Sequence, residues 1–268
     1  MRIAALIAAY HNPEALERLL NRLDTPLWTA YVHIDAKSDF TQFVHLTNKA
    51  HFSEVRIPCF WGSIDLVKAT LLLLRLAFDN PAITHFYLMS GECFPIKDDD
   101  YIRHVLSQSD GNFLQFVKMP VWHKPLERLE RYHFIRTDNI VLQKIFRRIA
   151  KHAPPRNVSR LLRGIQPFGG LTWWMLNRAT VMRILDYLQK NDWYTDAFRF
   201  SFCPDEMFFQ TLVRHLGITP DRSSPTATKW KPGAPHPEII TPAILDEMKK
   251  EWHFCARKFV YPVGTSNS

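Results

Sequence analysis

The sequence predicts a mixed α/β fold in which helices flank a mostly parallel β-sheet. Apolar runs of strand length alternate with amphipathic helical patterns along the first part of the chain, and this alternation is typical of parallel sheets covered on both faces. The chain has 268 residues, of which 46% are apolar and 13% are aromatic, so it can bury a substantial core. No internal repeat, low-complexity region or long flexible linker divides it, which favours one continuous domain over residues 1–268.

The first part of the chain supplies most of the predicted sheet. Short apolar runs predict strands at 3–10, 29–35, 53–60 and 84–90. Periodic apolar residues predict helices at 13–23, 63–78 and 98–106. Asn12 and Pro13 are residue types favoured at a helix N-cap and at the first helical position, so we interpret the opening apolar run as a buried strand and not as a signal peptide.

The pattern is less regular after residue 113. The predicted strands here are 112–118 and 169–176, the predicted helices are 139–152, 178–189 and 204–215, and a tail over 226–262 closes the chain. Helix 139–152 and the residues up to 163 are strongly basic: Lys144, Arg147, Arg148, Lys151, Arg156, Arg160 and Arg163. Apolar residues are interleaved at helical spacing, which fits either an interfacial helix on an anionic membrane or an ordinary helix with one solvated face.

The composition argues against several classes of protein. The four cysteines are widely separated and form no C-x-x-C pair, and the twelve histidines show no H-E-x-x-H spacing. Neither a zinc site nor a disulfide framework is therefore expected, and the cysteine usage suits a reducing cytoplasm. No segment approaches the ~20 apolar residues that span a bilayer. The formal charge of +8 favours anionic partners, for which nucleotide phosphates, nucleic acid and an acidic membrane face are all candidates.

Two groups of polar residues are candidates for a functional site. Ligands of parallel sheets bind at the carboxyl ends of the strands, which places Tyr10–Asn12, His33–Asp35 and Ser90–Glu92 along one rim. Separately, the adjacent carboxylates Asp205 and Glu206 follow a proline and precede an apolar run. These residue types favour a helix start for backbone reasons alone, and a catalytic carboxylate is the alternative.

Five motifs occur in order along the chain: WGSIDLVKATLLLL (61–74), YLMSGECFPIK (87–97), GGLTWWMLNRATV (169–181), CPDEMFFQTLV (203–213) and FCARKF (254–259). Together they resemble the core-2/I-branching glycosyltransferases, a family of β-1,6-N-acetylglucosaminyltransferases and peptide O-xylosyltransferases with many bacterial members. LIAAYHNPEALERLLNRLD and YVHIDAKSDF are similar to the N-terminal half of compact bacterial forms. The resemblance implies a GT-A type fold with a Rossmann-like sheet, a nucleotide-sugar-binding half at 1–112, and an acceptor and catalytic half at 113–268.

The resemblance also implies the chemistry of individual residues. Glu206 matches the glutamate of the family's PDE motif, which acts as catalytic base, and Asp205 would support it. Lys258 matches a lysine that contacts the diphosphate of the donor, and Arg257 lies beside it, so positive side chains would stand in for a metal ion. A second family cation, an arginine upstream of this lysine, has no clear counterpart here, and the candidates for its role are Lys229, Lys231 and His236. Asp98–Asp100 match the D-x-D metal motif formally, but acids at this place are expected to cap a helix, and no metal is expected.

The binding residues follow from the same resemblance. Asp35 is similar to an aspartate that binds the uridine, although a strand-ending aspartate is often a turn residue. The implied UDP-binding residues are Ala9, Tyr10, His11, Asp35, Arg257 and Lys258. The implied sugar contacts are Ser90, Gly91, Glu92, Trp173, Trp230, Arg131 and Tyr132. Core packing is the alternative for the tryptophans, and a solvated helix face is the alternative for the basic and aromatic residues of segment 121–136.

These observations predict an inverting, metal-independent glycosyltransferase. The expected donor is a UDP-sugar, with N-acetylglucosamine as the transferred sugar and xylose as the alternative. The expected acceptor is a hydroxyl of a glycan or lipid-linked glycan in bacterial surface polysaccharide or lipooligosaccharide assembly. We expect a cytoplasmic enzyme, with peripheral attachment to the inner face of the plasma membrane left open. A basic nucleic-acid-binding protein and an inactive glycan-binding relative are the rival classes, but no nucleic-acid-binding motif is present and no such partner is expected.

Overall fold

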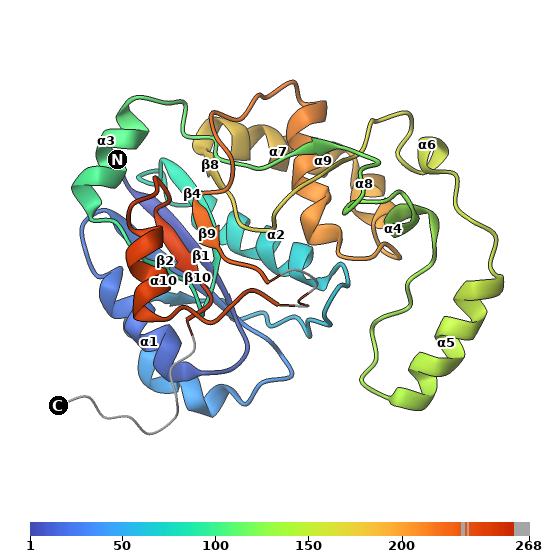
Figure 1. Cartoon of the computed structure of the whole chain (residues 1–268), viewed down its shortest axis with the longest axis horizontal. Coiled ribbons are helices and arrows are strands. Elements are labelled where there is room, and N and C mark those ends of the chain that lie inside the picture. The colour runs from blue at the N-terminus through green and yellow to red at the C-terminus, as the bar shows by residue number, and fades with distance from the viewer. Residues whose placement is uncertain (232–233, 235, 260–268) are drawn as a thin grey trace.

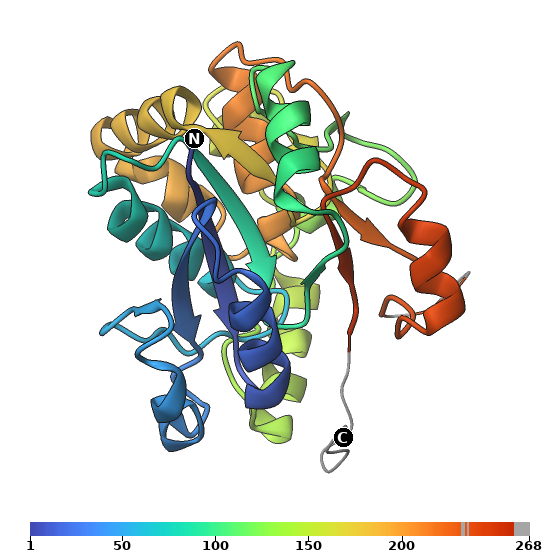
Figure 2. The ribbon, with the colours of Figure 1, turned by 90° about the vertical axis from the view of Figure 1, so that its left-hand side faces the viewer.

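A computed structural model describes residues 1–231, 234 and 236–259. Among these residues, a central five-stranded sheet has the order β3-β2-β1-β4-β8 (Figures 1 and 2). Its strands are β1 (Ile3–Ala9), β2 (Trp28–Ile34), β3 (His51–Phe52), β4 (His85–Ser90) and β8 (Met175–Asn177). β1 pairs in parallel with β2 and β4, β2 pairs in parallel with β3, and β8 runs antiparallel to β4. The predicted α/β fold with a mostly parallel sheet is confirmed.

Helices cover both faces of this sheet. The α-helices are α1 (Pro13–Arg22), α2 (Asp65–Phe78), α3 (Asp99–Ser107), α4 (Glu127–Glu130), α5 (Ile140–His152), α6 (Val158–Leu161), α7 (Arg178–Lys190), α8 (Asp192–Ala197), α9 (Phe208–His215) and α10 (Pro242–Met248). The 3-10 helices are η1 (Phe40–Leu46) and η2 (Pro204–Glu206). The described part of the chain contains no helix that is both long and apolar enough to span a membrane.

The alternation along β1 shows how the two cores form. Leu6 packs in a core with residues of α2, α7 and α9, whereas Ile3 and Ile7 pack in a second core with residues of α1 and α3. Neighbouring residues of a strand point to opposite faces, so a strand covered on both sides is apolar throughout. Figure 2 shows α2 and α7 on one side of the sheet and α3 on the other. Packing on both faces therefore fixes the position of the edge at which the parallel strands end.

Two smaller sheets join distant segments to this frame. The first has the order β5-β10-β9, with β5 at Phe94–Pro95, β9 at Thr226–Thr228 and β10 at Cys255–Arg257. The second pairs β6 (Val117–Lys118) with β7 (Phe168–Gly169). Because β10 pairs antiparallel with β5, which closely follows β4, the C-terminal cations are brought to the end of the central sheet.

The prediction of a strand over 53–60 is wrong, because β3 ends at Phe52. The N–H of Ser53 still donates to the carbonyl of Val32 in β2, but two N–H groups further along are taken by side chains instead of by a ladder. Ile57 N–H donates to Nε2 of His33 at 2.8 Å, and Cys59 N–H donates to Oδ1 of Asp35 at 3.2 Å. Pro58 has no N–H to offer. The segment consequently lines the ends of β2 without extending the sheet.

Two further predictions are corrected in the second half of the chain. Helix 204–215 is interrupted: η2 ends at Glu206, Met207 has a φ of −137°, and α9 begins at Phe208. The strand over 169–176 is split into β7 and β8, and the strand over 112–118 is reduced to β6 with an isolated bridge at Phe113. The tail at 226–262 contains β9, α10 and β10 as far as the described residues reach, and 260–262 lie outside them.

Candidate active site

A cavity of 730 Å³ opens where β1, β2 and β4 end, and its volume lies in the range of about 300–1,000 Å³ that is usual for small-molecule sites. Both predicted halves of the chain contribute to its walls. The predicted site residues that line it are Ala9, Tyr10, His11, Asp35, Ser90, Gly91, Glu92, Trp173, Asp205, Glu206, Trp230, Arg257 and Lys258. Arg131 and Tyr132 are not among the lining residues. His236, one of the candidates for a second diphosphate-binding cation, also lines the cavity.

The register of the parallel strands places the first group of residues. Ala8 of β1 lies opposite Ser90 of β4, and the N–H of Gly91 donates to the carbonyl of Ala8 at 3.1 Å. On the other side, the N–H of Asp35 donates to the carbonyl of Ala9 at 2.9 Å. A Cβ atom on Gly91 would lie 3.0 Å from the Cβ of Ala9, so a glycine permits this close approach. The three strand ends therefore meet at one wall of the cavity.

Asp35 and His33 are fixed at the end of β2 by backbone groups. Oδ1 of buried Asp35 accepts hydrogen bonds from the N–H groups of Lys37 at 2.9 Å and Cys59 at 3.2 Å. Burial lowers the pKa of His33 to about 4, so its imidazole is neutral and Nε2 accepts the N–H of Ile57. These contacts leave Oδ2 of Asp35 without a hydrogen-bond partner among the described residues and available to a ligand.

A buried carboxylate holds the two C-terminal cations. Glu92 lies 3.3 Å from Nζ of Lys258, 3.7 Å from Nη2 of Arg257 and 3.3 Å from Nε2 of His11. Burial alone would raise the pKa of Glu92, but the contact with His11 and the charges of Lys258 and Arg257 outweigh it and lower the pKa. Glu92 was expected to contact a sugar, and the structure shows it as the counter-ion of these cations.

The guanidinium of Arg257 has two further contacts in the cavity. Its Nε donates to Oγ of Ser90 at 3.1 Å, and its Cζ lies 4.9 Å from the ring centre of Trp173. The neighbouring Trp174 is completely buried. The paired tryptophans are thus divided between the cavity and the core, and the stacked ring fixes the direction of the cation.

Glycines from two motifs hold the turn that carries Asp205 and Glu206. The N–H of Cys203, a residue with a left-handed φ of 49°, donates to the carbonyl of Gly62 at 2.8 Å. The N–H of Gly170 donates to the carbonyl of Glu206 at 2.8 Å. A Cβ atom on Gly170 would lie 1.9 Å from the carbonyl oxygen of Gln115, so only glycine fits here. The WGS and GGLTWW motifs therefore position the PDE turn.

The Glu206 carboxylate is paired with two cations. Nζ of Lys124, which is buried, and Nη1 of Arg128 both donate to Oε2, the latter at 2.6 Å. Oε1 has no hydrogen-bond partner among the described residues. The helix start predicted at Asp205 and Glu206 is one short 3-10 turn, η2. The two cations bind one oxygen of the Glu206 carboxylate and leave the other available.

Asp205 has a different environment from its neighbour. Its Oδ2 accepts a hydrogen bond from Oγ1 of Thr172 at 2.8 Å. Burial and then the negative charge of Glu206 raise the pKa of Asp205 from 3.8 to about 6. Two adjacent carboxylates therefore reach the cavity with different partners, and the raised pKa of Asp205 is of the kind found in sites for acid–base chemistry.

The predicted acceptor residues Arg131 and Tyr132 lie outside the cavity. After α4 the chain turns into an extended conformation, with a ψ of 154° at Arg131. The ring of Tyr132 packs 5.9 Å from the ring of Phe134, and the guanidinium of Arg156 lies 5.3 Å from it. Tyr132 therefore faces a cluster of aromatic and basic side chains and not the cavity. A role for these two residues at the cavity is not supported.

The sequence did not indicate Lys124 or Thr172, and it placed Arg128 only in a general acceptor region. Lys124 and Arg128 are separated by one helical turn in the segment KPLER, which is the only signal that both could reach one carboxylate. Thr172 lies between the glycines and tryptophans of the GGLTWW motif and looks like an ordinary strand residue. Its role depends on the loop between β7 and β8, which local periodicity does not predict.

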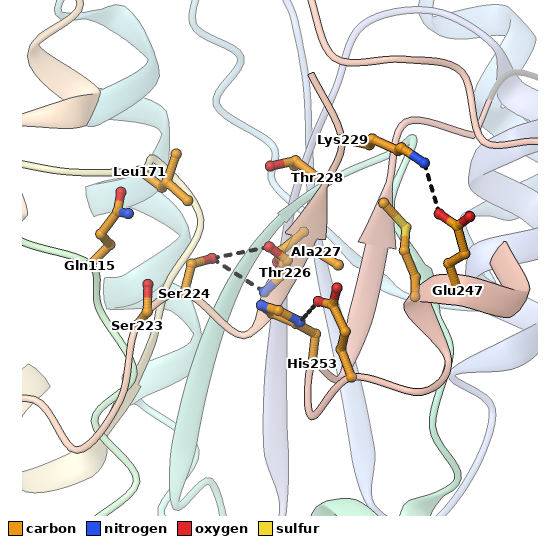
Figure 3. A pocket seen from close by; sticks show the side chains of 12 residues that line it. Gln115, Leu171, Ser223, Ser224, Thr226, Ala227, Thr228, Lys229, Glu247 and His253 are labelled. Carbon is orange, nitrogen blue, oxygen red and sulfur yellow. Dashed lines mark hydrogen bonds and ion pairs between the residues drawn. The ribbon is translucent and has the colours of Figure 1, made fainter. Parts of the chain in front are cut away.

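A second cavity of 360 Å³ adjoins the first, since Leu171 and Thr228 line both (Figure 3). Its acidic residues are already paired: Glu247 lies 2.7 Å from Nζ of Lys229, and Glu251 lies 2.8 Å from Nδ1 of His253. Lys229 is paired with Glu247 and does not line the larger cavity, so its position does not support a role as the second diphosphate-binding cation. The larger cavity is the one that contains both the adjacent carboxylates Asp205 and Glu206 and the adjacent cations Arg257 and Lys258.

The acids of the formal D-x-D motif have structural partners. Oδ1 of Asp98 accepts the N–H of Tyr101 and caps α3, as the sequence predicts. Asp99 accepts hydrogen bonds from Thr25 and from the indole N–H of Trp28. The described residues contain no group of three or more His, Cys, Asp or Glu side chains arranged to hold a metal ion.

Comparison with known proteins identifies the family. Residues 4–252 match the sequence profile of the Core-2/I-branching enzymes, which covers most of the chain. The chain belongs to the Core-2/I-branching enzyme family. Its relatives in this family include "Xylosyltransferase oxt" of Drosophila melanogaster, 27% identical over 228 residues, and human "Xylosyltransferase 1", 25% identical over 198 residues. The family predicted from the motifs is therefore confirmed.

A third Core-2/I-branching relative is named for a different sugar. "Beta-1,3-galactosyl-O-glycosyl-glycoprotein beta-1,6-N-acetylglucosaminyltransferase 4" of Mus musculus is 29% identical over 226 residues. The alignments cover 81% of this chain with the mouse protein and 80% with the Drosophila protein, but only 48% and 24% of those proteins. The chain thus spans about a quarter to a half of the length of these relatives.

Solved structures resemble this family member more distantly. Staphylococcus aureus TarS (1–349) has a TM-score of 0.34 at 14% identity, covering 72% of this chain and 49% of TarS. A 4-diphosphocytidyl-2C-methyl-D-erythritol synthase has a TM-score of 0.41 at 10% identity, covering 93% of this chain and 99% of the synthase.

Asp205 makes stability depend on pH in this family member. Because its pKa is about 6 in the folded protein and 3.8 for the ordinary group, the folded state holds the proton more tightly than the unfolded chain. The free energy of unfolding should therefore fall as pH rises from about 4 to about 6 and stay lower above that range. Asp205→Asn, which keeps an acceptor for Thr172, should raise it at neutral pH by at most about 3 kcal/mol.

Urea unfolding over this pH range measures the effect. The matched control is Asp186→Asn on the exposed side of α7, which should leave the pH profile of the wild type unchanged. If the free energy of unfolding of Asp205→Asn depended on pH in the same way as that of the wild type, the Asp205 carboxyl would not be the group that titrates.

Proposed function

We propose that this protein is an inverting glycosyltransferase that transfers a sugar from a UDP-sugar to a hydroxyl of a glycan acceptor. N-acetylglucosamine is the preferred donor sugar in this proposal, and xylose is the alternative, because relatives named for each are similarly distant. We place the reaction in the assembly of a bacterial surface polysaccharide or lipooligosaccharide, on the cytoplasmic side of the plasma membrane. The acceptor would be a glycan or a lipid-linked glycan.

The observation that carries the proposal is the composition of one cavity. It contains an acid pair, Asp205 and Glu206, and a cation pair, Arg257 and Lys258, together with the polar ends of the central strands. Glycosyl transfer from a nucleoside diphosphate needs a base for the acceptor hydroxyl and positive charge for the departing diphosphate. A protein that binds a nucleotide sugar without catalysis would need the positive charge but not the base.

The donor is proposed to lie across the end of the sheet. The free Oδ2 of Asp35 and the ring of Tyr10 would receive the uridine, and Lys258 and Arg257 would contact the diphosphate. Glu92 pairs with both cations and keeps them in place before the donor binds, and its single negative charge leaves the pair with net positive charge for the diphosphate. In this proposal the side chains, and no metal ion, stabilise the diphosphate.

Glu206 is proposed to be the base. Its Oε1 would accept the proton of the acceptor hydroxyl while the hydroxyl oxygen attacks the anomeric carbon from the face opposite the diphosphate. The bond from that carbon to the phosphate oxygen breaks, its electron pair goes to the leaving UDP, and the configuration inverts. Lys124 and Arg128 hold Oε2 and so fix the direction of Oε1. Asp205, the adjacent carboxyl group in the same cavity, is the rival base.

Substitution of Glu206 separates catalysis from binding. Glu206→Gln keeps the shape of the side chain but cannot accept a proton at this step, so the turnover number should fall by about 10²–10⁴-fold. UDP affinity should change little, because Glu206 does not contact the proposed nucleotide site. Turnover with a UDP-sugar and calorimetric titration with UDP measure the two effects.

Controls are needed because Glu206→Gln leaves the buried Lys124 without its counter-ion. The double variant Lys124→Met/Glu206→Gln removes that unpaired charge and should stay inactive while it folds stably. Glu127→Gln, on the exposed side of α4, is the matched control and should be active. An active Glu206→Gln would exclude Glu206 as the base, and an inactive Asp205→Asn together with that result would assign the base to Asp205.

Substitution of Lys258 tests the diphosphate site. Lys258→Ala removes a positive charge that should contact UDP but not uridine, so the Kd for UDP should rise by about tenfold or more while the Kd for uridine changes less than about threefold. Lys249→Ala, an exposed lysine near α10, is the control. Equal losses for UDP and uridine in calorimetry would show that Lys258 does not bind the phosphates.

A further inference from the structure

Helix α5 stands apart from the rest of the protein. Figure 1 shows it at one edge of the molecule, connected to the body by extended segments on both sides. None of its residues is buried. On the side that faces the body, the ring of Phe146 lies 5.8 Å from the ring of Phe134, and Nε2 of Gln143 donates to the carbonyl of Thr137 at 2.9 Å. The apolar side of the helix is therefore not used to hold the fold together.

An apolar stripe runs along the solvent side of α5. It consists of Val141, Leu142, Ile145 and Ile149, whose side chains are 64%, 41%, 47% and 52% exposed. Spacings of one, four and eight residues place them on one face of the helix. A soluble protein normally turns such a face towards its core, and an exposed apolar stripe on a regular helix indicates a binding surface.

Positive charges adjoin this stripe. Lys144, Arg147, Arg148 and Lys151 lie on the neighbouring face of α5, all of them exposed, and the helix has no acidic residue. None of these four forms an ion pair with a carboxylate of the described residues. A basic face beside an apolar face, on one helix without charge compensation, is the arrangement of helices that lie in the interface of an anionic membrane.

The structure separates this helix from the arginines that follow it. The sequence suggested one basic helix as far as residue 163, but α5 ends at His152. The guanidinium of Arg156 donates to the carbonyl of Ala197 at 3.2 Å and stacks on Tyr132, and that of Arg163 lies 4.3 Å from the ring centre of Trp193. Arg156 and Arg163 therefore contact the rest of the fold, whereas the four basic residues of α5 make no such contact in the described part of the chain.

We propose that α5 docks this protein on an anionic membrane, with the apolar stripe among the lipid chains and the four basic residues at the headgroup phosphates. A second copy of the chain fits the same face less well, because two such helices side by side would bring eight uncompensated positive charges together. The docking rests on the helix alone. Its use for a lipid-linked acceptor rests on the proposed function.

The helix is also linked to the candidate active site. Nζ of Lys37, which lines the cavity, lies 3.6 Å from Asp138, two residues before α5 begins. Arg136, in the same connecting segment, pairs with buried Asp65 of α2 at 3.2 Å. A membrane bound by α5 would therefore lie near the cavity, where a glycan on a lipid carrier could reach Glu206.

Vesicle flotation with the full chain tests the proposal. The probes are vesicles of equal parts phosphatidylglycerol and phosphatidylcholine, and vesicles of phosphatidylcholine alone. The wild type should float with the anionic vesicles and not with the neutral ones, and added salt should weaken binding by screening the charges. Ile145→Asp/Ile149→Asp and Lys144→Glu/Lys151→Glu should each weaken binding by about tenfold or more.

The controls separate the possible outcomes. Met182→Asp, at an exposed apolar residue of α7, should bind the vesicles like the wild type. Wild-type binding by Ile145→Asp/Ile149→Asp would overturn the proposal, as would a dimer in light scattering that the same variant abolishes. UDP titration of each variant keeps the two proposals apart: lost flotation with intact UDP binding concerns α5 alone, and flotation without UDP binding in the wild type would contradict the proposed function.

Discussion

The parallel pairing of β1 with β2 and β4 is the constraint on which the rest of the structure depends. It buries β1 on both faces and forces three strands to end at the same edge. The polar residues that follow these strands, Tyr10, Asp35 and Ser90–Glu92, are brought together only by this register. A shift of one residue in either pairing would turn apolar side chains into the cavity and separate Asp35 from the close approach of Gly91 and Ala9.

The second half of the chain adds the reactive groups to that edge. Backbone contacts to Gly62 and Gly170 fix the turn of Asp205 and Glu206, and the pairing of β10 with β5 delivers Arg257 and Lys258. The charges are balanced locally. Glu206 is held by Lys124 and Arg128, and Glu92 holds the C-terminal cations, so each of these charged groups has a partner of the opposite sign.

Much of this arrangement could be predicted from the sequence, because strand runs and helix periods in the first half are regular and because five motifs occur in family order. The sequence could not reveal that the amides of Ile57 and Cys59 bond to His33 and Asp35, since Pro58 is the main local sign against a strand. It also missed Lys124 and Thr172, whose roles arise from contacts across long sequence separations. The sequence suggested sugar contacts for Arg131 and Tyr132, which do not line the cavity, because charge and aromatic character alone do not show which way a side chain points. The sequence left the role of the apolar residues of α5 undecided, because the same helical spacing also fits a helix that packs its apolar face against a core.

The central claim is that the cavity binds a UDP-sugar through its own cations. Calorimetric titration of the protein with UDP, in buffer containing EDTA and again with added Mn²⁺, tests it most directly. The account predicts saturable binding at one site per chain, with the same affinity in both buffers. Absence of UDP binding in EDTA, followed by binding when Mn²⁺ is added, would contradict the account and assign the diphosphate to a metal ion.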